Sequence, residues 1–311
     1  MTGTVVWLAG IACRVLCDDG ELRTVPLPPR REQGLVAVGD EVEVALSAAG
    51  PLLGVVSPRR TFLARPDPQD PRRALVIAAN VDVVAIVVSV VEPPLHPRLI
   101  DRFLVAIQLG GATPLLVVNK LDRLAELDDA GRAEELDKLA PYRAMGLGVV
   151  VCSTRTGEGL ADLRAALHAK TCVFVGHSGV GKSSLVNAFD ASLGAKTGEL
   201  SVAWGGRGKH TTTASTLHVL DDGTRVIDTP GVRAVGLWSL EPRELGRYFP
   251  EIEAHAGGCR FNDCLHEIEP RCAVKDASAR GEIPAARYET YLRILASLRE
   301  EAAHAAHEGR G

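Results

Sequence analysis

The stretch 176–184 contains residue types that can bind the phosphate groups of a nucleotide. It fits the pattern G-x-x-x-x-G-K-S, with an apolar run at 171–175 before it and a helix-like segment after it. In such a loop, backbone N–H groups surround phosphate oxygens at the positive end of a helix. The Lys182 ammonium is expected at the β- and γ-phosphates, and the Ser183 hydroxyl on Mg²⁺. The alternative is a glycine-rich turn without a ligand. The predicted nucleotide-binding residues here are Gly176, His177, Ser178, Gly179, Val180, Gly181, Lys182, Ser183 and Ser184.

A guanine-binding loop is predicted at Asn119, Lys120 and Asp122, directly after the apolar run 114–118. The Asp122 carboxylate can accept hydrogen bonds from the N1–H and N2–H groups of guanine. Adenine lacks this donor pair, so ATP is disfavoured. The Asn119 amide is expected to tie this loop to the phosphate loop, and the Lys120 side chain to cover the base. Ser153, after the next apolar run, is expected where backbone N–H groups approach the guanine O6. The alternative for Asp122 is a plain helix cap.

Two further segments carry candidate ligands of Mg²⁺ and of the γ-phosphate. Asp228 ends an apolar run and precedes a Thr-Pro-Gly turn. Its carboxylate is expected to hold Mg²⁺ through water, and the Gly231 N–H to contact the γ-phosphate. Thr211 and Thr212 end a glycine-rich segment, and one of their hydroxyls, with Thr212 favoured, is expected to complete the Mg²⁺ shell. An ordinary turn is the alternative at 228–231.

The residue that orients the attacking water is predicted to be His210. Many GTPases place a glutamine directly after the Asp-x-x-Gly turn, whereas this chain has Val232, whose side chain cannot polarise water. His210 precedes the threonines and is therefore the catalytic candidate. The alternative is an RNA-facing histidine beside Lys209.

A metal centre is predicted near the C-terminus, where three cysteines and one histidine occur at short spacing. The four residues are Cys259, Cys264, His266 and Cys272. Tetrahedral Zn²⁺ prefers such a set, so a structural zinc site is expected, with clustered buried cysteines as the alternative. The remaining cysteines lie in strand-like runs and are interpreted as small core residues.

The composition bounds the partners of the chain. Its 311 residues are 46% hydrophobic and 24% charged, with a formal net charge of −4. This balance is ordinary for a soluble globular protein, so any RNA contact must come from local patches. The longest apolar run, 83–91, is too short to span a bilayer, and no signal-peptide pattern begins the chain. A cytoplasmic monomer with no membrane partner is expected.

The spacing of apolar residues divides the chain into three predicted domains. Residues 1–65 contain short alternating runs between turn residues, which favours an all-β barrel of the OB type, with or without a role in RNA binding. Residues 66–235 alternate strands with helices, typical of a mostly parallel α/β sheet covered on both faces. Residues 236–311 are mostly helical around the metal centre. The proline- and arginine-rich stretch 57–73 is expected to be an extended linker.

Individual elements of the central domain follow from the same spacing. Strands are predicted at 81–91, 114–118, 148–152 and 171–175, helices at 98–109, 124–140 and 160–169, and a hairpin at 215–227. A further helix is predicted at 284–303 in the C-terminal domain.

The order of the motifs predicts a circularly permuted GTPase. The guanine-binding residues come first, then the phosphate loop, then Asp228, whereas ordinary small GTPases begin with the phosphate loop. The same sheet can be opened elsewhere when the original termini are close together. The segment after Gly231 then leads into the C-terminal domain, so hydrolysis is expected to move that domain relative to the sheet.

Taken together, these motifs resemble the bacterial ribosome small-subunit-dependent GTPase A family over nearly the whole chain. The matching stretches are Arg65-Pro66, Ala78–Asp82, Asn119–Asp122, Gly176–Ser184, Gly208–Thr213, Asp228–Arg233, Gly236–Trp238 and the Cys/His set. His177 departs from the glutamine common in that family, and Ser153-Thr154 replaces the commoner Ser-Ala.

The resemblance implies an OB domain, a permuted GTPase domain and a zinc domain. It also implies that the protein binds the small (30S) ribosomal subunit and its rRNA and acts as a late-stage maturation switch, with GTP hydrolysis to GDP stimulated by the subunit. In the family the histidine that matches His210 is thought to be catalytic. A GTP-dependent RNA-binding adaptor with little turnover is the alternative function, because Val232 removes the usual catalytic side chain.

Overall fold

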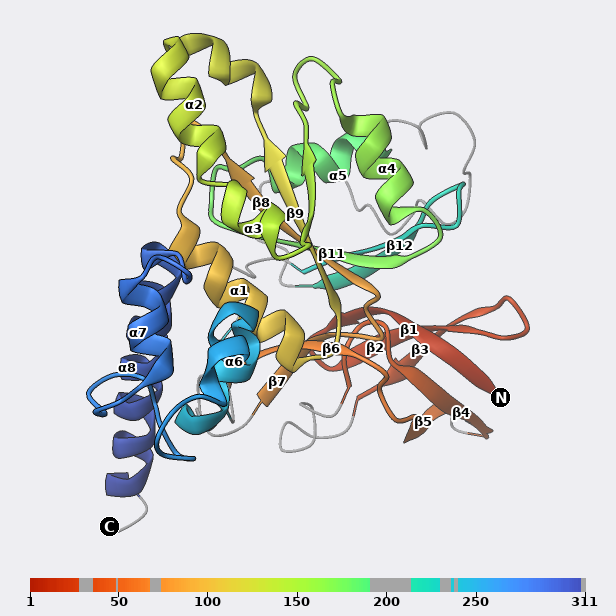
Figure 1. Ribbon diagram of the computed structural model, residues 1–311. Coiled ribbons are helices and arrows are strands. Elements are labelled where there is room, and N and C mark those ends of the chain that lie inside the picture. The colour runs from red at the N-terminus through yellow and green to blue at the C-terminus, as the bar shows by residue number, and fades with distance from the viewer. Residues whose placement is uncertain are drawn as a thin grey trace.

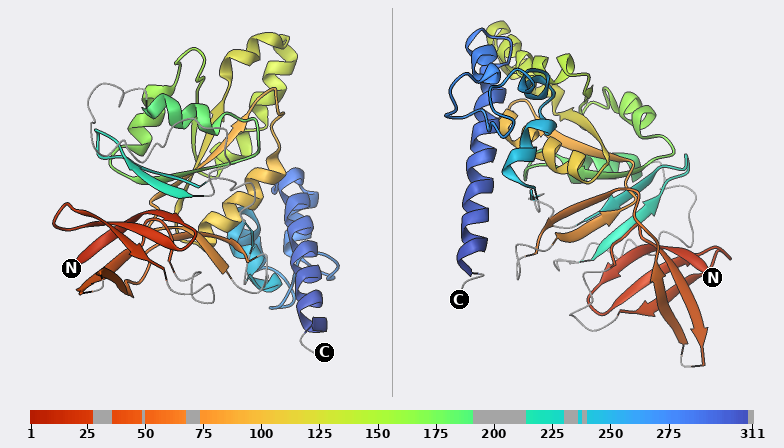
Figure 2. Two further views of the ribbon diagram at one scale, coloured as in Figure 1. Left: turned by 180° about the vertical axis from the view of Figure 1, so that it is seen from behind. Right: turned by 60° about the horizontal axis from the view of Figure 1, so that its bottom comes forward.

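The structure is a computed structural model that describes residues 1–27, 36–48, 50–67, 74–190, 214–229, 236–237 and 240–308 (Figure 1). Within this part of the chain, a strand-rich N-terminal barrel lies below a sheet flanked by helices, and a group of C-terminal helices lies beside them (Figures 1 and 2).

The N-terminal strands close into a small barrel. They are β1 (Thr2–Ala9), β2 (Ala12–Cys17), β3 (Leu22–Pro26), β4 (Glu41–Ser47) and β5 (Gly50–Val56). β1 pairs antiparallel with both β2 and β4, β2 with β3, and β4 with β5, while β3 contacts β5. The resulting order 1-2-3-5-4-1 is that of an OB barrel, as predicted. Alternate side chains such as Val5, Val15 and Val42 fill its interior.

The predicted linker 57–73 is partly wrong, because part of it forms a hairpin. β6 (Phe62–Pro66) pairs antiparallel with β7 (Ala74–Ala79). Leu63 and Ala78 face each other in this pair and are fully buried. The hydrophobic gain from burying both strands outweighs the proline content around them.

The central sheet contains six strands in the order β10-β9-β8-β11-β13-β12. Their bounds are β8 (Val83–Ser89), β9 (Thr113–Asn119), β10 (Gly148–Val151), β11 (Thr171–Val175), β12 (Ser215–Val219) and β13 (Arg225–Asp228). The first five in this order run parallel, and β12 is antiparallel to β13. The predicted central strands and the predicted hairpin are therefore confirmed.

Helices cover both faces of this sheet, as predicted (Figure 1). They are α1 (Pro97–Leu109), α2 (Asp129–Asp137), α3 (Ala140–Ala144), α4 (Leu160–Leu167) and α5 (Lys182–Asp190). β8 shows why two covers are needed, since every one of its residues is buried. Ile86 belongs to the core on the α1 side, and Val87 to the core beneath α4 and α5.

The single helix predicted at 124–140 is wrong. The chain instead forms a 3₁₀ helix, η2 (Leu121–Glu126), followed by α2 and α3. Asp128 has extended backbone angles, and its carboxylate accepts a hydrogen bond from the Gly131 N–H at 2.8 Å. This N-cap starts a new helix inside the segment that was predicted to be continuous.

The barrel and the central sheet are joined edge to edge. β1 pairs antiparallel with β12 through Trp7 opposite Thr216 and Leu8 opposite Ser215. Among the described residues, eleven strands therefore form one sheet that runs from β10 into the barrel.

The C-terminal region is helical, as predicted. It comprises η4 (Pro242–Tyr248), α6 (Pro250–Ala256), α7 (Ala273–Ala279) and the long α8 (Ala285–Glu308). η4 and α8 contact α1, and α7 and α8 stand at one side of the molecule (Figure 1). Ile252 and Leu295 belong to the same hydrophobic core as Phe103 of α1. Within the described chain, no helix is both long and apolar enough to cross a membrane.

Candidate functional site

The predicted phosphate loop connects β11 to α5, in the strand–loop–helix context that this motif requires. Gly176, Gly179 and Gly181 have φ angles of +141°, +85° and +96°, which other residues rarely adopt. A Cβ atom at Gly176 would lie 2.2 Å from the carbonyl oxygen of Val87. Only glycine therefore fits at this point, where the loop crosses the end of β8.

The Lys182 ammonium lies at the start of α5, where the helix N-terminus is also positive. The Lys182 ammonium donates hydrogen bonds to the carbonyl oxygens of Gly176 at 2.9 Å and His177 at 2.8 Å, so it lies over the loop. Ser183 and Ser184 are exposed in the first turn of the helix. A helix N-terminus with a lysine and hydroxyl groups suits an anionic phosphate chain with its Mg²⁺.

Asn119 links three loops at the end of the parallel strands. Its side chain is fully buried, donates to the carbonyl oxygen of Val180 at 3.0 Å and accepts from the Thr154 N–H at 3.2 Å. A Cβ atom at Gly181 would lie 2.3 Å from the Asn119 amide nitrogen. The bond between Asn119 and the phosphate loop, inferred from the sequence, is present.

Asp122 is held on both carboxylate oxygens. One oxygen accepts a hydrogen bond from the Ser153 hydroxyl at 2.6 Å, and the other lies 3.5 Å from the Arg155 guanidinium. The Ser153 hydroxyl also accepts from the N–H groups of Arg155 and Thr156, each at 3.2 Å. Ser153 thus orients Asp122 through its hydroxyl, a contact that the sequence did not indicate.

Arg155 and Glu92 contact two of the predicted guanine-binding residues, and the sequence did not indicate these contacts. Lys120 has a left-handed φ of +63°, and its ammonium donates to the carbonyl oxygen of Glu92 at 2.5 Å. The Glu92 carboxylate pairs with Arg123 at 2.6 Å, and this hydrogen bond lowers the pKa of Glu92. The only sequence signal for Arg155 was its place two residues after Ser153, and Glu92 carried none.

Asp228 lies exposed at the carboxyl end of β13. Its neighbour Ile227 is opposite Val173 of β11, so the Asp228 backbone is near the point where the phosphate loop begins. The other predicted ligands of this region, His210, Thr211, Thr212 and Gly231, lie outside the described residues.

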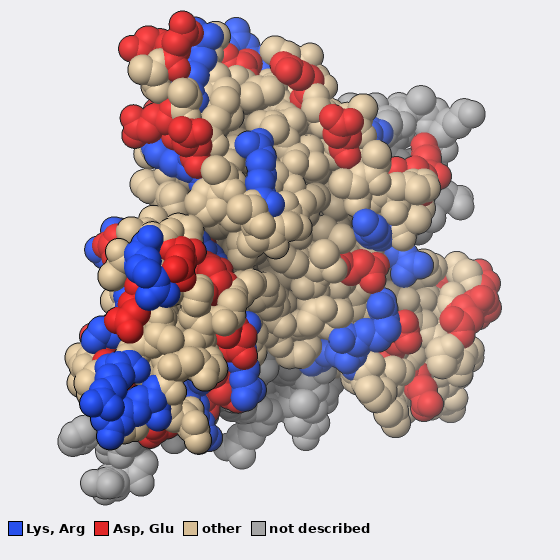
Figure 3. Space-filling view, in the orientation of Figure 1, with Lys and Arg blue, Asp and Glu red and all other residues tan. Residues whose placement is uncertain are grey.

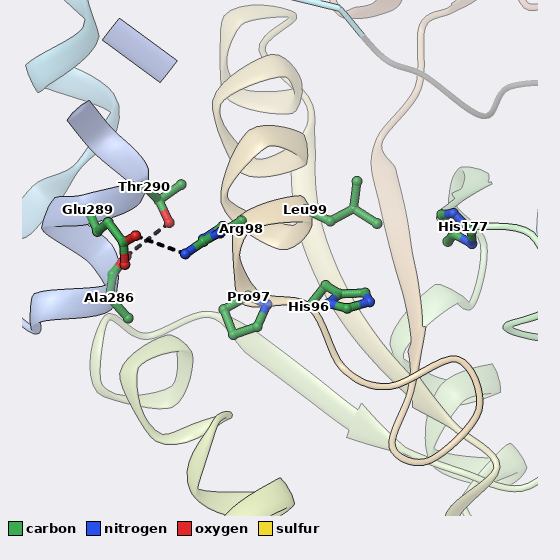
Figure 4. Close-up of a pocket in the computed structure, with 8 residues that line it drawn as sticks. All are labelled: His96, Pro97, Arg98, Leu99, His177, Ala286, Glu289 and Thr290. Atoms are coloured by element: carbon green, nitrogen blue, oxygen red, sulfur yellow. Dashed lines mark hydrogen bonds and ion pairs between the residues drawn. The ribbon is translucent and has the colours of Figure 1, made fainter. Parts of the chain in front are cut away.

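A pocket of about 670 Å³ borders the phosphate loop on the side of the C-terminal helices. Figure 4 shows His96 and Leu99, at the start of α1, on the side that faces His177. It also shows Arg98 directed toward α8, where its guanidinium pairs with Glu289 at 2.8 Å. His177 of the phosphate loop therefore lines the same pocket as the start of α1 and residues of α8.

The predicted metal ligands are brought together in a second site. The ligand atoms of Cys259, Cys264, His266 and Cys272 all lie within 4.8 Å of one another. The His266 Nδ1 atom is 3.5 Å from the Cys259 sulfur and 3.4 Å from the Cys272 sulfur, and these sulfurs are 3.8 Å apart. Burial lowers the pKa of His266 and raises the pKa of Cys264 to about 12. These donors could hold one metal ion.

The four cysteines outside this cluster are buried, as the sequence indicated. They are Cys13, Cys17, Cys152 and Cys172, and all are free thiols. Burial raises the pKa of each of Cys13 and Cys152 to about 11, so both remain neutral thiols at physiological pH.

The fold and site define the class of protein as a P-loop GTPase with circularly permuted motifs. Along the chain the guanine-type loop precedes the phosphate loop, and the sheet brings the two together through Asn119 and Val180. The family model described as RsgA GTPase matches residues 56–238. The chain belongs to the RsgA GTPase family and is a GTP hydrolase.

Several relatives are similar over most of their length. "Small ribosomal subunit biogenesis GTPase RsgA 1" of Vibrio vulnificus strain YJ016 is 44% identical over 249 residues, which are 80% of this chain and 69% of the relative. "Small ribosomal subunit biogenesis GTPase RsgA" of Haemophilus influenzae strain 86-028NP is 38% identical over 303 residues, covering 96% and 85%.

Two solved structures share the fold. YjeQ from Thermotoga maritima superposes with a TM-score of 0.74 at 32% identity, covering 96% of this chain and 98% of that protein. YloQ, described as a circularly permuted GTPase, gives a TM-score of 0.71 at 29% identity, covering 96% and 95%. The predicted permutation is confirmed.

Proposed function

We propose that this GTPase acts in a late stage of small ribosomal subunit maturation, binding the 30S subunit and its rRNA and hydrolysing GTP when the subunit stimulates it. The observation that carries this proposal is its similarity, over 80–96% of the chain, to relatives named as small ribosomal subunit biogenesis GTPases. The adaptor alternative is not favoured, since those relatives are named as GTPases.

The nucleotide is proposed to lie across the carboxyl ends of β9, β10 and β11. Asp122 binds the guanine, Lys120 covers it, and the loop 176–184 surrounds the phosphates. The support is the network through Asn119, which ties the two loops into one site. Mg²⁺ is proposed to be held by Ser183, Asp228 and Thr212, with Thr211 and Gly231 beside the γ-phosphate.

The metal of the Cys/His site is proposed to be a structural Zn²⁺. A tetrahedron with Zn–S bonds of about 2.3 Å has sulfur–sulfur edges of about 3.8 Å. The Cys259 and Cys272 sulfurs are 3.8 Å apart, which matches this edge. Four protein ligands also leave no open position for a substrate, as is typical of a structural site.

RNA contact is proposed to rest on local basic patches. Figure 3 shows Lys and Arg side chains interspersed with Asp and Glu over the visible face, with a basic group at the lower left, over the C-terminal helices. This distribution agrees with the formal net charge of −4. We propose a cytoplasmic monomer with units at 1–65, 66–235 and 236–311, the first boundary falling inside β6.

A turnover assay tests the proposed function. GTP hydrolysis by the full chain is measured alone, with purified 30S subunits and with 50S subunits as the control. We expect the 30S subunits to stimulate hydrolysis and the 50S subunits to leave the rate unchanged. Equal rates in all three conditions would contradict a role that depends on the small subunit.

His210 is proposed to orient the attacking water. His210→Ala should keep GTP affinity but lose most of the subunit-stimulated turnover, by a factor of about 100 or more. His168→Ala is the control, because His168 is exposed at the end of α4. Full stimulated turnover in His210→Ala would refute the role.

A further inference from the structure

The loop that carries two of the metal ligands is held by an outer layer of hydrogen bonds. The Glu269 carboxylate accepts from the N–H groups of Leu265 and Glu267 at 2.9 Å and of Ile268 at 3.1 Å. These amides flank His266, whose φ of +60° is unfavourable for a residue with a side chain. Glu269 therefore stabilises the turn in which His266 adopts this φ angle.

Two tyrosines of α8 attach the same loop to the long helix. The Tyr288 hydroxyl donates to the carbonyl oxygen of His266 at 2.5 Å, and the Tyr291 hydroxyl donates to that of Leu265 at 2.9 Å. Tyr291 is almost fully buried, and its ring also packs edge-on against Phe249. The position of the metal loop and the position of α8 are thus linked by direct bonds.

The same turns of α8 also bind the GTPase domain. The buried Arg287 guanidinium pairs with Asp101 of α1 and with Glu251 of α6, each at 2.5 Å. Asp101 accepts a further hydrogen bond from the Tyr142 hydroxyl at 2.8 Å. With the ion pair between Arg98 and Glu289, this places two charged contacts between α8 and the first turns of α1.

We propose that metal binding is communicated to the GTPase domain through residues 287–291 of α8, by a route separate from the segment after Asp228. Within these five residues, Tyr288 and Tyr291 hold the metal loop, while Arg287 and Glu289 hold α1. A helical turn is rigid, so a shift of α8 away from the metal loop would also strain its ion pairs with α1. The start of α1 in turn borders the pocket that it shares with His177 of the phosphate loop (Figure 4).

The proposal rests on the metal centre proposed above, and metal content is therefore measured first. Elemental analysis of the full chain should give one zinc per chain. If no metal binds, the metal centre itself is wrong, and this coupling falls with it. With zinc bound, the remaining measurements test the coupling alone.

Zinc affinity tests the outer layer. In competition with a chelator, Tyr288→Phe/Tyr291→Phe and Glu269→Gln should each bind zinc about tenfold more weakly than the unchanged chain. Two controls should leave the affinity unchanged. Tyr248→Phe removes a hydroxyl that makes no hydrogen bond to the described residues, and Glu300→Gln changes an exposed carboxylate.

Hydrogen exchange of α1 tests the communication. Removing zinc from the unchanged chain should speed exchange in the first turns of α1 by about tenfold. Without zinc the metal loop is no longer fixed, so the hydrogen bonds of Tyr288 and Tyr291 to it no longer hold α8 in place against α1. The double tyrosine variant should show this faster exchange even with zinc bound, whereas Glu269→Gln with saturating zinc should not. Exchange in α1 that is independent of zinc, in a chain shown to bind it, would overturn the proposal.

Discussion

At the scale of single residues, the Asp122 carboxylate is proposed to determine which base the site accepts. It is oriented by the Ser153 hydroxyl at 2.6 Å, and its side chain is only 12% exposed. Asp122→Asn should weaken GTP binding by a factor of about 100 or more, because the amide can no longer accept from both guanine donors. The same variant should gain affinity for XTP, whose base carries a carbonyl group where guanine carries an amino group. Equilibrium binding of the two nucleotides measures this.

Asp128→Asn is the matched control for this exchange. Asp128 caps α2 rather than facing the site, and asparagine caps a helix as well as aspartate does. Its GTP affinity should equal that of the unchanged chain. Unaltered GTP binding by Asp122→Asn would show that Asp122 does not read the base.

Gly181 tests the contact between the two nucleotide loops. Gly181→Ala places a Cβ atom 2.3 Å from the Asn119 amide nitrogen at a φ of +96°. GTP affinity should fall about tenfold or more, since strain at such a position costs about 1–3 kcal/mol. Gly157→Ala is the control: its φ is +84°, but a Cβ there meets nothing within 4 Å. It should lower the Tm while GTP affinity stays unchanged, and equal losses of affinity in both variants would contradict a specific clash.

Residue types and spacing predicted the loops but not all the contacts within them. Asn119 and Asp122 were recognised because the chemistry of guanine and the end of a strand constrain them directly. The contact between Asp122 and Arg155 joins residues 33 positions apart and arises only when β9 and β10 lie side by side. Glu92 enters the site through its backbone carbonyl, which no side-chain pattern reports.

At the scale of elements, a buried ion pair joins Asp40, directly before β4, to Arg59 in the segment between β5 and β6. Arg59 donates to both carboxylate oxygens of Asp40, at 2.7 and 2.8 Å, and Asp40 is completely buried. Arg59→Ala should lower the free energy of unfolding by about 3 kcal/mol, because the buried Asp40 carboxylate keeps the hydrogen bond from the Ala37 N–H but loses its charged partner. Denaturant-induced unfolding measures the change.

The neighbouring Arg60 provides the comparison for this prediction. It pairs with Asp82 at 3.4 Å, and its side chain is 64% exposed. Arg60→Ala should cost less than about 0.5 kcal/mol, as for most exposed pairs. Similar losses in the two variants would mean that the burial of Asp40 is not what makes its pair important.

Local patterns predicted most elements, and they failed where a distant partner or a single cap decides. β8 was recognisable because both its faces are buried, which gives a continuous apolar run. β6 was not, since a five-residue strand between prolines becomes favourable only when it pairs with β7. The break before α2 lies where Leu127 is extended and the Asp128 side chain caps the new helix, which are local details that the apolar spacing does not report.

At the scale of the whole molecule, the units differ in how they are joined. The C-terminal helices share one hydrophobic core with α1 and the central sheet, which includes Ile86, Phe103 and Leu295. The barrel has a core of its own, and it meets the rest of the molecule through two residue pairs between β1 and β12 and through the segment before β4. There the carbonyl oxygens of Val38 and Gly39 accept hydrogen bonds from Ala79 and Asn80, each at 2.9 Å, and the Val38 side chain enters the main core. The spacing of apolar residues divided the chain into three units, but it could not show which of them share a core, because that depends on tertiary contacts.

This difference predicts how the molecule opens. Native-state hydrogen exchange at increasing denaturant should place the slowest amides of α8 and β8 in a single cooperative unit, since unfolding either one exposes the same core. Amides of β2 and β3 should exchange through an opening of lower free energy, because these strands bury their side chains in the small core of the barrel and can open without exposing the main core. A lower-energy opening of α8 alone would show instead that the C-terminal helices move independently of α1. In that case the C-terminal helices would be able to move on hydrolysis without α1. One shared core predicts instead that α1 and the C-terminal helices move together.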